Sequence, residues 1–445
     1  MRQHSRIMRF LALLLGLSLI AAACGDDDDT EAEGDGGAEE EGDEGGGGIE
    51  APPAGAAAPS CTGTADGTLT FGGLLPQTGD LSFLGPPEEA GAALAVQDIN
   101  AAGGVLGQDV VFMPGDSGDT DPDVANPTVD SHLAANADAI VGAAASGVSL
   151  NVIDKITGAC VIQFSPANTS PQFTDYDDDD LYFRTAPSDV LQGQVLADLM
   201  VEDGIANAAL LARQDSYGEG LLEFTMAPFE EQGGEVVLDQ VYDPEAQSFE
   251  AEVDAVVSED PDALVMIGFD ESGRILNSLF EQGFTPDEKA IYLVDGNIGN
   301  ALGEDFTEPG TLVGIKGTLP SAELTDDFRE RLLGVDPALV DFSYSAETYD
   351  ALVITALAAA VADSDDPAAV AAEINGVTRD GEACETFEDC MALVEGGEDI
   401  DYDGPSGPQE FSQPGEPTAA SFAIMTYGED NRIDDAATTF RQASL

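Results

Sequence analysis

Residues 140–174, IVGAAASGVSLNVIDKITGACVIQFSPANTSPQFT, are the stretch from which the fold is inferred. An apolar run ends at Gly142, and a small-residue turn carrying Ser146 and an amphipathic stretch follow. A second apolar run, 160–164, ends in a second polar turn. This order predicts two parallel strands joined by a helix, with both turns at the same edge of the sheet. Hydroxyls and free backbone N–H groups in such turns suit a small anion, for example a carboxylate.

Short apolar runs and amphipathic stretches alternate along most of the chain. Strands are expected near 68–75, 108–114, 208–211, 235–238, 263–267 and 290–294, and helices near 86–100, 121–135, 218–232, 249–258, 271–282 and 344–362. This alternation predicts an α/β fold whose parallel sheets are covered on both faces. After the N-terminal segments roughly 385 residues remain, which exceeds one typical domain and indicates two lobes.

The N-terminus has the features of an export signal. Three arginines precede an apolar run, 10–20, which is shorter than a membrane span and ends in three alanines and Cys24. This pattern resembles a bacterial lipobox, although Ala21 stands where leucine is preferred. We therefore expect a signal peptide at 1–23 and a lipid on Cys24. An ordinary cleaved signal with an incidental cysteine is the alternative.

Residues 24–60 are expected to form a disordered acidic tether. The segment holds runs of Asp, Glu and Gly and then turns to Ala and Pro. It cannot bury enough apolar surface to fold, and its charge favours an extended chain. A leash between a lipid anchor and a folded region is one interpretation, and a low-complexity insert without a role is the other.

The whole chain is strongly acidic. It contains 14 Lys and Arg against 87 Asp and Glu, a net charge of −73, and no tryptophan. Such a polyanion is not expected to bind nucleic acid or an anionic lipid surface, so the membrane is expected as a partner only through the lipid anchor. A saline habitat and a generally acidic proteome both remain open as the cause.

The chain contains five cysteines, and four remain once Cys24 is taken as the lipid site. Outside the cytoplasm an even remainder favours disulfides. We predict the pairs Cys61–Cys160 and Cys384–Cys390. A metal site is the competing interpretation, and it is weak because the chain has no Cys-x-x-Cys and one histidine, His132, after the signal.

No catalytic signature stands out. The chain has no Gly-x-Ser-x-Gly elbow, P-loop or His-Glu-x-x-His. His132 lies in an expected helix and is interpreted as a surface or hydrogen-bonded residue rather than a base. Residues 168–170 fit the glycosylation pattern, but an anion-binding turn explains them better. We expect a binding protein without metal or cofactor, and not an enzyme.

Five motifs in order resemble the type I periplasmic binding proteins, specifically their leucine/isoleucine/valine-binding branch. They are residues 98–107, 140–174, 184–189, 217–221 and 399–408, within a match from about 68 to 432. The resemblance implies two Rossmann-like lobes joined by a three-segment hinge, with crossings near Pro187, Leu319 and Ser421. It implies lobe 1 at 61–187 plus 319–420, and lobe 2 at 188–318 plus 421–445.

The resemblance also implies a ligand site between the lobes. Ser146, Ala167 and Thr169 would hold the carboxylate of an amino acid, with Thr169 also accepting from its ammonium group. Helix N-capping is the simpler role for Ser146 and Thr169. Tyr217 would close over the ligand as an aromatic wall, unless it only packs the lobe interface.

The remaining site residues follow from neighbouring positions. Asp295 is the first candidate partner for the ammonium group and Asp270 the second, while either could be a solvated loop acid. Leu84, beside Phe83, and Phe269 stand at wall positions and keep the pocket apolar while reshaping it.

These expectations lead to one function and three alternatives. We expect an extracytoplasmic, lipid-anchored, monomeric receptor of an ABC importer. It would capture an amino acid, most simply a branched-chain one, and deliver it to permease subunits by hinge closure. A ligand-sensing receptor module, a binder of amides, urea or aromatic acids, and an enzyme such as an amidase are the alternatives.

Overall fold

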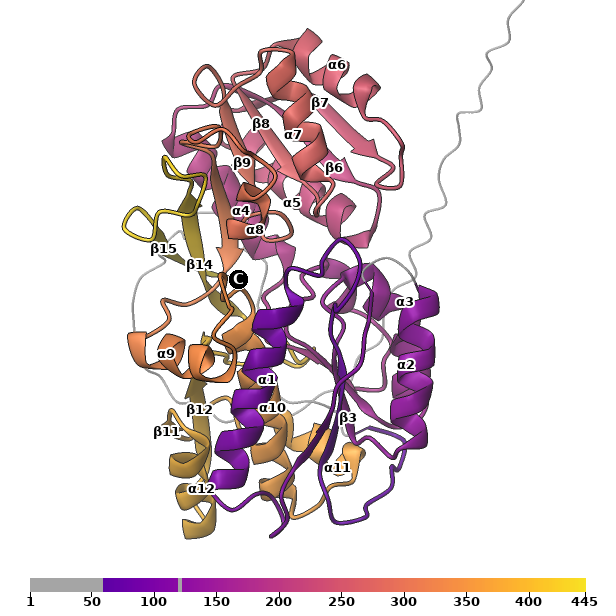
Figure 1. Cartoon of the computed structure of the whole chain (residues 1–445). Coiled ribbons are helices and arrows are strands. Elements are labelled where there is room, and N and C mark those ends of the chain that lie inside the picture. The colour runs from indigo at the N-terminus through magenta and orange to yellow at the C-terminus, as the bar shows by residue number, and fades with distance from the viewer. Residues whose placement is uncertain (1–58, 119–121) are drawn as a thin grey trace, which may run out of the picture. The chain divides into compact units, whose positions relative to one another are not determined.

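The computed structural model describes residues 59–118 and 122–445. The expected signal peptide, Cys24 and nearly all of the expected tether lie outside these residues. The described residues form two lobes, each built on its own sheet (Figure 1). Both are layered α/β structures, as the alternating pattern of the sequence predicts.

The first lobe contains a parallel five-stranded sheet in the order β2-β1-β3-β4-β5. Its strands are β1 (Thr70–Leu74), β2 (Val111–Met113), β3 (Ala139–Gly142), β4 (Ile162–Ser165) and β5 (Tyr182–Arg184). The helices between them are α1 (Gly85–Ala101), α2 (Pro122–Ala134) and α3 (Ser146–Thr157), and the 3₁₀ turn η1 (Pro171–Phe173) follows β4.

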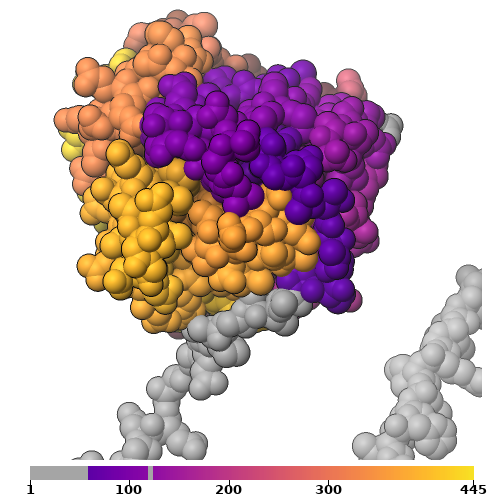
Figure 2. All heavy atoms as spheres, turned by 90° about the horizontal axis from the view of Figure 1, so that it is seen from below, coloured from indigo at the N-terminus to yellow at the C-terminus, as the bar shows by residue number. Residues whose placement is uncertain are grey.

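A later part of the chain returns to the first lobe. It comprises α9 (Asp326–Val335), α10 (Ser345–Ala362), α11 (Pro367–Ile374), α12 (Phe387–Gly396) and a small sheet of β11 (Glu382–Cys384), β12 (Ile400–Gly404) and β13 (Gly407–Pro408). Helix α10 packs on α1, and early and late segments share one face of the molecule (Figure 2). Helix α10 has the length and hydropathy of a membrane span, but 83% of it is buried, as in the core helix of a soluble domain.

The second lobe contains a seven-stranded sheet in the order β15-β14-β10-β9-β8-β6-β7. Its strands are β6 (Asn207–Arg213), β7 (Glu235–Tyr242), β8 (Ala263–Ile267), β9 (Ala290–Leu293), β10 (Lys316–Pro320), β14 (Ala419–Thr426) and β15 (Thr439–Ser444). Its helices are α4 (Asp189–Glu202), α5 (Ser216–Glu231), α6 (Glu250–Glu259), α7 (Ser272–Glu281) and α8 (Asn300–Gly303).

The second sheet differs from the expected all-parallel arrangement. Strand β14 runs antiparallel to β10, and β15 runs antiparallel to β14. An antiparallel neighbour needs no helical crossover, so a short connection can add these two strands at the sheet edge. The sequence offered no alternation of strands and helices in this region from which the pairing could be predicted.

The chain passes between the two sheets three times. It does so between β5 and α4, after β10, and before β14. These are the regions where the family resemblance implies crossings, while the exact lobe boundaries stay a prediction. Most expected strands and helices begin and end within about three residues of the observed ones; the expected strands at 208–211 and 235–238 are shorter than β6 and β7.

Two disulfides form as predicted, Cys61–Cys160 and Cys384–Cys390. The first ties the start of the described chain to the first lobe. Asp365 reinforces this attachment, because its Oδ2 accepts hydrogen bonds from three successive backbone N–H groups, 66–68. The point at which the N-terminal segment joins the folded chain is therefore fixed.

Candidate ligand-binding site

Strands β3 and β4 end side by side, because they pair in parallel with Val141 opposite Phe164. Gly142 ends β3 with a positive φ of 125°, and a Cβ there would meet the Leu74 carbonyl oxygen at 2.0 Å. Only glycine fits this turn. Helix α3 then begins at Ser146. Because only a short turn separates β3 from α3, the end of β3 fixes the position of this serine.

Asn168 joins the two turns. Its Nδ2 donates to the carbonyl oxygens of Ala143 at 3.0 Å and Ala144 at 2.8 Å. The Ser146 Oγ accepts from the backbone N–H of Ser170 at 3.3 Å. Buried hydrogen bonds of this kind hold both turns in one arrangement, which preorganises the donors at the edge of the sheet.

A pocket between the lobes gathers most of the predicted site residues. Its lining contains six of the eight, namely Leu84, Ser146, Ala167, Tyr217, Phe269 and Asp295, together with Leu81, Ala144, Ala145, Gly296 and Tyr344. The walls are apolar apart from a few convergent polar groups, as in sites for small molecules. We call this pocket the cleft.

Asp295 lies at the centre of a hydrogen-bond network in the cleft. Its Oδ1 accepts from Tyr217 Oη at 2.7 Å and from Gln192 Nε2 at 2.8 Å. Its Oδ2 accepts from Tyr344 Oη at 2.7 Å. Tyr344 precedes α10 of the first lobe, whereas Asp295 follows β9 of the second. The network therefore connects the two lobes directly.

The aromatic wall of the cleft is a stack of three side chains. The rings of Tyr217 and Phe269 stack with centroids 5.4 Å apart, and the Arg213 guanidinium lies 3.4 Å from the centroid of the Phe269 ring. Asp215 and Glu271 hold Arg213 through ion pairs. Asp215 also caps α5 by accepting from the N–H groups of Tyr217 and Gly218. One carboxylate thus orients both the cation and the wall tyrosine.

Two further buried groups lie close to this network. The Asp189 carboxylate and the Thr169 hydroxyl have no partner among the described residues other than each other: the nearby Thr169 hydroxyl lowers the pKa of Asp189, and the Asp189 N–H donates to the Thr169 carbonyl at 2.7 Å. Both side chains are fully buried. An unpaired buried acceptor is costly, and such groups in a native fold call for an explanation.

Burial dominates the electrostatics of the two acids. It raises the pKa of Asp295, and the hydrogen bonds from Tyr344, Tyr217 and Gln192 partly oppose the shift. Burial also raises the pKa of Asp189 well above its ordinary value, and the charge of Asp295 adds to the effect. Two carboxylates in one low-dielectric region favour a positively charged partner.

Two predicted residues do not line the cleft. Thr169 is fully buried. Asp270 is exposed and lines a neighbouring hollow with Phe83 and Phe269. His132 is buried, and its Nε2 is hydrogen-bonded to the Gly73 carbonyl at 2.8 Å, in agreement with its interpretation as a structural residue. Within 59–118 and 122–445 no group of three or more His, Cys, Asp or Glu is placed to hold a metal ion.

Residues 68–431 match the periplasmic binding proteins as a family. The chain belongs to this family. Its members are substrate-binding proteins and not enzymes. The match covers every strand of both sheets except β15, and all the residues that line the cleft.

Known periplasmic binding proteins resemble the chain along most of its length. The chemotactic signal transduction system substrate-binding protein BasB of Halobacterium salinarum is 26% identical over 365 residues, which cover 78% of this chain and 84% of the relative. The Leu/Ile/Val-binding protein homolog 1 of Brucella abortus is 26% identical over 329 residues, covering 71% and 84%.

Solved structures share the fold. The leucine-binding protein LivK of Thermotoga maritima has a TM-score of 0.69 at 22% identity, covering 84% of this chain and 98% of that one. The branched-chain amino acid binding protein LivJ of Streptococcus pneumoniae, in complex with isoleucine, has a TM-score of 0.69 at 21% identity, covering 84% and 100%.

Sequence reasoning missed Tyr344, which lines the cleft of this periplasmic binding protein, and missed Asp189 and Gln192, which lie beside Asp295 without lining the cleft. Asp189 belongs to the motif at 184–189, and a carboxylate at the first position of a helix is usually attributed to the helix dipole. Tyr344 gave no signal in the sequence, because it contacts Asp295 from a segment 49 residues further along the chain.

Proposed function

We propose that the chain is the substrate-binding component of an ABC importer and binds a free amino acid in the cleft. The observation that carries the proposal is the placement of opposite chemistries on either side of the cleft. Ser146 and the turns after β3 and β4 offer donors, and Asp295 offers a carboxylate. A zwitterion satisfies both sides at once.

The apolar wall supports a hydrophobic side chain on the ligand. The apolar side chains of Leu81, Leu84 and Phe269 line the cleft. Burial of a branched aliphatic side chain against them would contribute about 1.5–3 kcal/mol. Leucine, isoleucine and valine are therefore the first ligands to test, and the names of the relatives from Brucella and Thermotoga point the same way.

An aromatic acid is a poorer candidate. A structure of similar fold from R. palustris holds benzoate, at 17% identity. In this chain a ligand with only a carboxylate would bring a negative charge close to Asp295 without an ammonium group to offset it. Like charges in a buried site repel strongly, so a ligand with an ammonium group is favoured.

Thermal melting of the mature protein with single candidate ligands tests the proposal. Leucine, isoleucine or valine should raise the melting temperature by mass action, whereas benzoate and urea should not. Ser146→Ala should weaken amino acid binding by about tenfold, because one hydrogen bond to a charged group is lost. Ser258→Ala on the exposed face of α6 is the matched control. A melting shift with benzoate alone would contradict the proposal.

A sensing role is the second candidate, and the similarity to BasB of Halobacterium salinarum favours it. Cross-linking of the ligand-bound protein in its own membranes separates the two roles. Recovery of permease subunits supports import, and recovery of a chemotaxis transducer supports sensing.

We also propose that a lipid on Cys24 anchors the protein to the cell membrane, with the folded chain outside the cytoplasm. The support is the sequence pattern around this cysteine together with the acidic segment that follows. Mass spectrometry of the N-terminal peptide tests it. A diacylglyceryl-modified Cys24 is expected in the native chain and not in the Cys24→Ser variant.

A further inference from the structure

Arg184 lies at the point where the first lobe meets the segment that leads to β14. It is the last residue of β5, opposite Ser165 at the end of β4, and its side chain is fully buried. Its guanidinium group contacts the turn after β4, residues 166–170, and Glu416, which is 232 residues away in the sequence. We call residues 166–170 the β4 turn. A buried cation between two segments fixes one relative to the other.

The first set of contacts fixes the backbone of the β4 turn. Arg184 Nη1 donates to the carbonyl oxygens of Asn168 at 3.2 Å and Ser170 at 2.8 Å. The carbonyl oxygen between them, at Thr169, accepts from the Asp189 N–H. Internal donors therefore bind three successive carbonyl oxygens. Because a carbonyl oxygen carries a partial negative charge, a turn whose carbonyls are held in this way is better suited to an anion.

Ser170 transmits this constraint to Ser146, which lines the cleft. The Ser170 carbonyl is bound by Arg184, and the Ser170 N–H donates to Ser146 Oγ at 3.3 Å. Since Ser146 Oγ accepts this bond, its own O–H can donate to a ligand carboxylate. Arg184 thus reaches a donor of the cleft through one intervening residue.

Glu416 holds the other side of Arg184. Its Oε2 accepts from Arg184 Nε at 2.8 Å and also from Nη2, and its Oε1 accepts from Thr174 Oγ1 at 2.9 Å. Both members of this ion pair are buried. The attraction in a buried ion pair offsets the loss of hydration only when further hydrogen bonds satisfy the remaining atoms. Thr174 and the β4 turn supply such bonds.

The segment that carries Glu416 leads into the second lobe. It lies beside β5, where the Arg184 N–H donates to the Gly415 carbonyl at 3.0 Å, and it enters β14 at Ala419. Gly415 has a positive φ of 72°, and a Cβ there would lie 2.5 Å from Phe183 Cδ1. Only glycine allows this close approach. The ion pair therefore joins the β4 turn to one of the three segments that pass between the lobes.

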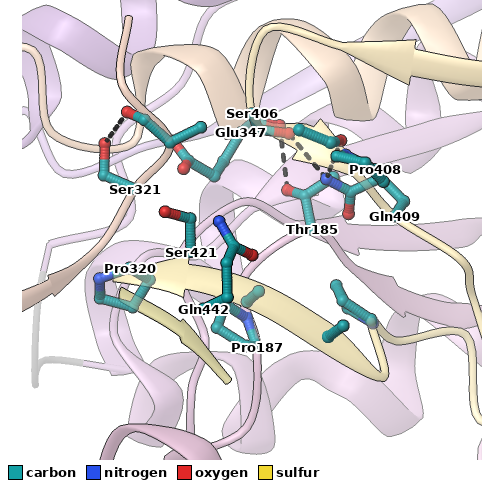
Figure 3. Close-up of a pocket in the computed structure, with 15 residues that line it drawn as sticks. Thr185, Pro187, Pro320, Ser321, Glu347, Ser406, Pro408, Gln409, Ser421 and Gln442 are labelled. Carbon is teal, nitrogen blue, oxygen red and sulfur yellow. Dashed lines mark hydrogen bonds between the residues drawn. The ribbon is translucent and has the colours of Figure 1, made fainter. Parts of the chain in front are cut away.

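The three segments meet around a cavity next to this ion pair (Figure 3). Its lining includes Thr185 from the first passage, Ser321 from the second and Ser421 from the third. Thr185 Oγ1 donates to the Glu347 carbonyl at 2.9 Å, which anchors the residue after Arg184 to α10. The backbone at Arg184 is thus held at the junction of the lobes.

We propose that Arg184 is a positioning residue for the ligand carboxylate, and that Glu416 in the segment before β14 holds Arg184 in place. The guanidinium group binds the carbonyls of the β4 turn and, through Ser170, keeps Ser146 oriented toward the ligand. Arg184 does not itself line the cleft, so it acts only through these residues. The proposal rests on the amino acid binding proposed above.

Isothermal titration of the mature protein with leucine and with leucinol tests the proposal. Leucinol keeps the ammonium group and the side chain of leucine but has a hydroxymethyl group in place of the carboxylate. Arg184→Lys keeps the positive charge, but an ammonium group lacks the planar fork that binds both carbonyl oxygens and Glu416 at once. Leucine affinity should fall about tenfold, whereas leucinol affinity should stay within twofold of the parent chain.

Arg331→Lys is the matched control. Arg331 pairs with Asp98 between α9 and α1, and neither residue lines the cleft, so both affinities should stay unchanged. Equal losses for leucine and leucinol in Arg184→Lys would overturn the proposal, because a purely structural role affects both ligands alike. An unchanged leucine affinity would overturn it as well. If Arg184→Lys does not fold, the double variant Arg184→Met, Glu416→Met provides the same test, because it leaves no member of the pair buried alone.

Hydrogen exchange of the unliganded protein, followed by NMR, gives a readout that needs no ligand. Relative to the amides of β8, the Ser170 N–H should exchange at least fivefold faster in Arg184→Lys and in Glu416→Gln than in the parent chain and in Arg331→Lys. Equal exchange in all four proteins would overturn the proposal. This readout also decides the matter where leucinol binds the parent chain too weakly to measure.

The two readouts separate this proposal from the proposed function. If the parent chain binds no amino acid but exchange at Ser170 rises in Arg184→Lys, the amino acid proposal fails and the positioning of the β4 turn by Arg184 stands. If leucine binds the parent chain and the variants change neither the leucine affinity nor the exchange, the positioning proposal fails alone.

Discussion

At the scale of single residues, the side chains of the cleft act through the partners that orient them. Asp295 is ringed by three donors, from Gln192, Tyr217 and Tyr344. These bonds stabilise a buried carboxylate that would otherwise favour its neutral form. The charge is thereby held at a fixed place in the cleft, where it is available to a ligand ammonium group.

Asp295→Asn should lower the affinity for an amino acid at least 30-fold at pH 8, because truncating a buried charge partner typically costs about 2–5 kcal/mol. Isothermal titration with leucine measures the change. Asp270→Asn is the matched control, since Asp270 is an exposed acid beside the same wall. The control should stay within twofold of the parent chain. The opposite ranking would make Asp270 the ammonium partner.

The same acid predicts a pH dependence of binding. Burial raises the pKa of Asp295, so the carboxylate gains a proton as the pH falls through that raised value. Only the ionised form attracts an ammonium group fully. Leucine affinity should therefore weaken from pH 8 towards pH 5, and in Asp295→Asn this dependence should be smaller.

At the scale of secondary structure elements, helix ends connect the local sequence to the cleft. Asp215 caps α5 and also pairs with Arg213, whose side chain is fully buried against Phe269. Thr325 caps α9 in the same way, with an acceptor for the Phe328 N–H, but holds no cation. The two capping residues therefore differ, because only Asp215 also forms an ion pair with a buried arginine.

Asp215→Ala should therefore cost more than Thr325→Ala. Loss of a cap alone costs about 1 kcal/mol, and loss of the ion pair to Arg213 should bring the total for Asp215→Ala to about 3 kcal/mol. Urea unfolding measures both values. Asp215→Ala should also weaken leucine binding, while Thr325→Ala should leave it unchanged. Equal costs would mean that the Arg213 pair adds no stability.

At the scale of the whole molecule, buried acids and a large negative charge act together. Burial raises the pKa of Glu347 and Asp138 to about 8 and that of Asp350 to about 7. An unfolded carboxyl group has a pKa near 4. The folded chain consequently binds more protons than the unfolded chain between these values, which makes stability fall as the pH rises.

The melting temperature at constant ionic strength should accordingly be higher at pH 6 than at pH 8.5. Differential scanning calorimetry measures it. Glu347→Gln should narrow the difference, because the side chain no longer ionises, whereas Glu410→Gln at an exposed position should not. A melting temperature that rises with pH over this range would contradict the assigned pKa shifts.

Much of the cleft followed from local sequence. The turns carrying Ser146 and Ala167 could be predicted because each directly follows an apolar strand, and adjacent parallel strands bring their ends together. The disulfides followed from counting cysteines in an exported chain. The turns depend on residues that are close together in the sequence, and four cysteines allow only a few pairings.

The sequence by itself determined the α/β alternation, the two lobes, the family and most of the cleft lining, since periodicity and motif order are local properties. Only the tertiary structure decided the antiparallel strands β14 and β15, the contact of Tyr344 with Asp295, and the burial of Glu347. Each of these depends on segments that meet across long stretches of chain. The packing of these distant segments decides which side chains are buried and which groups they contact. The local residue pattern alone does not encode this packing.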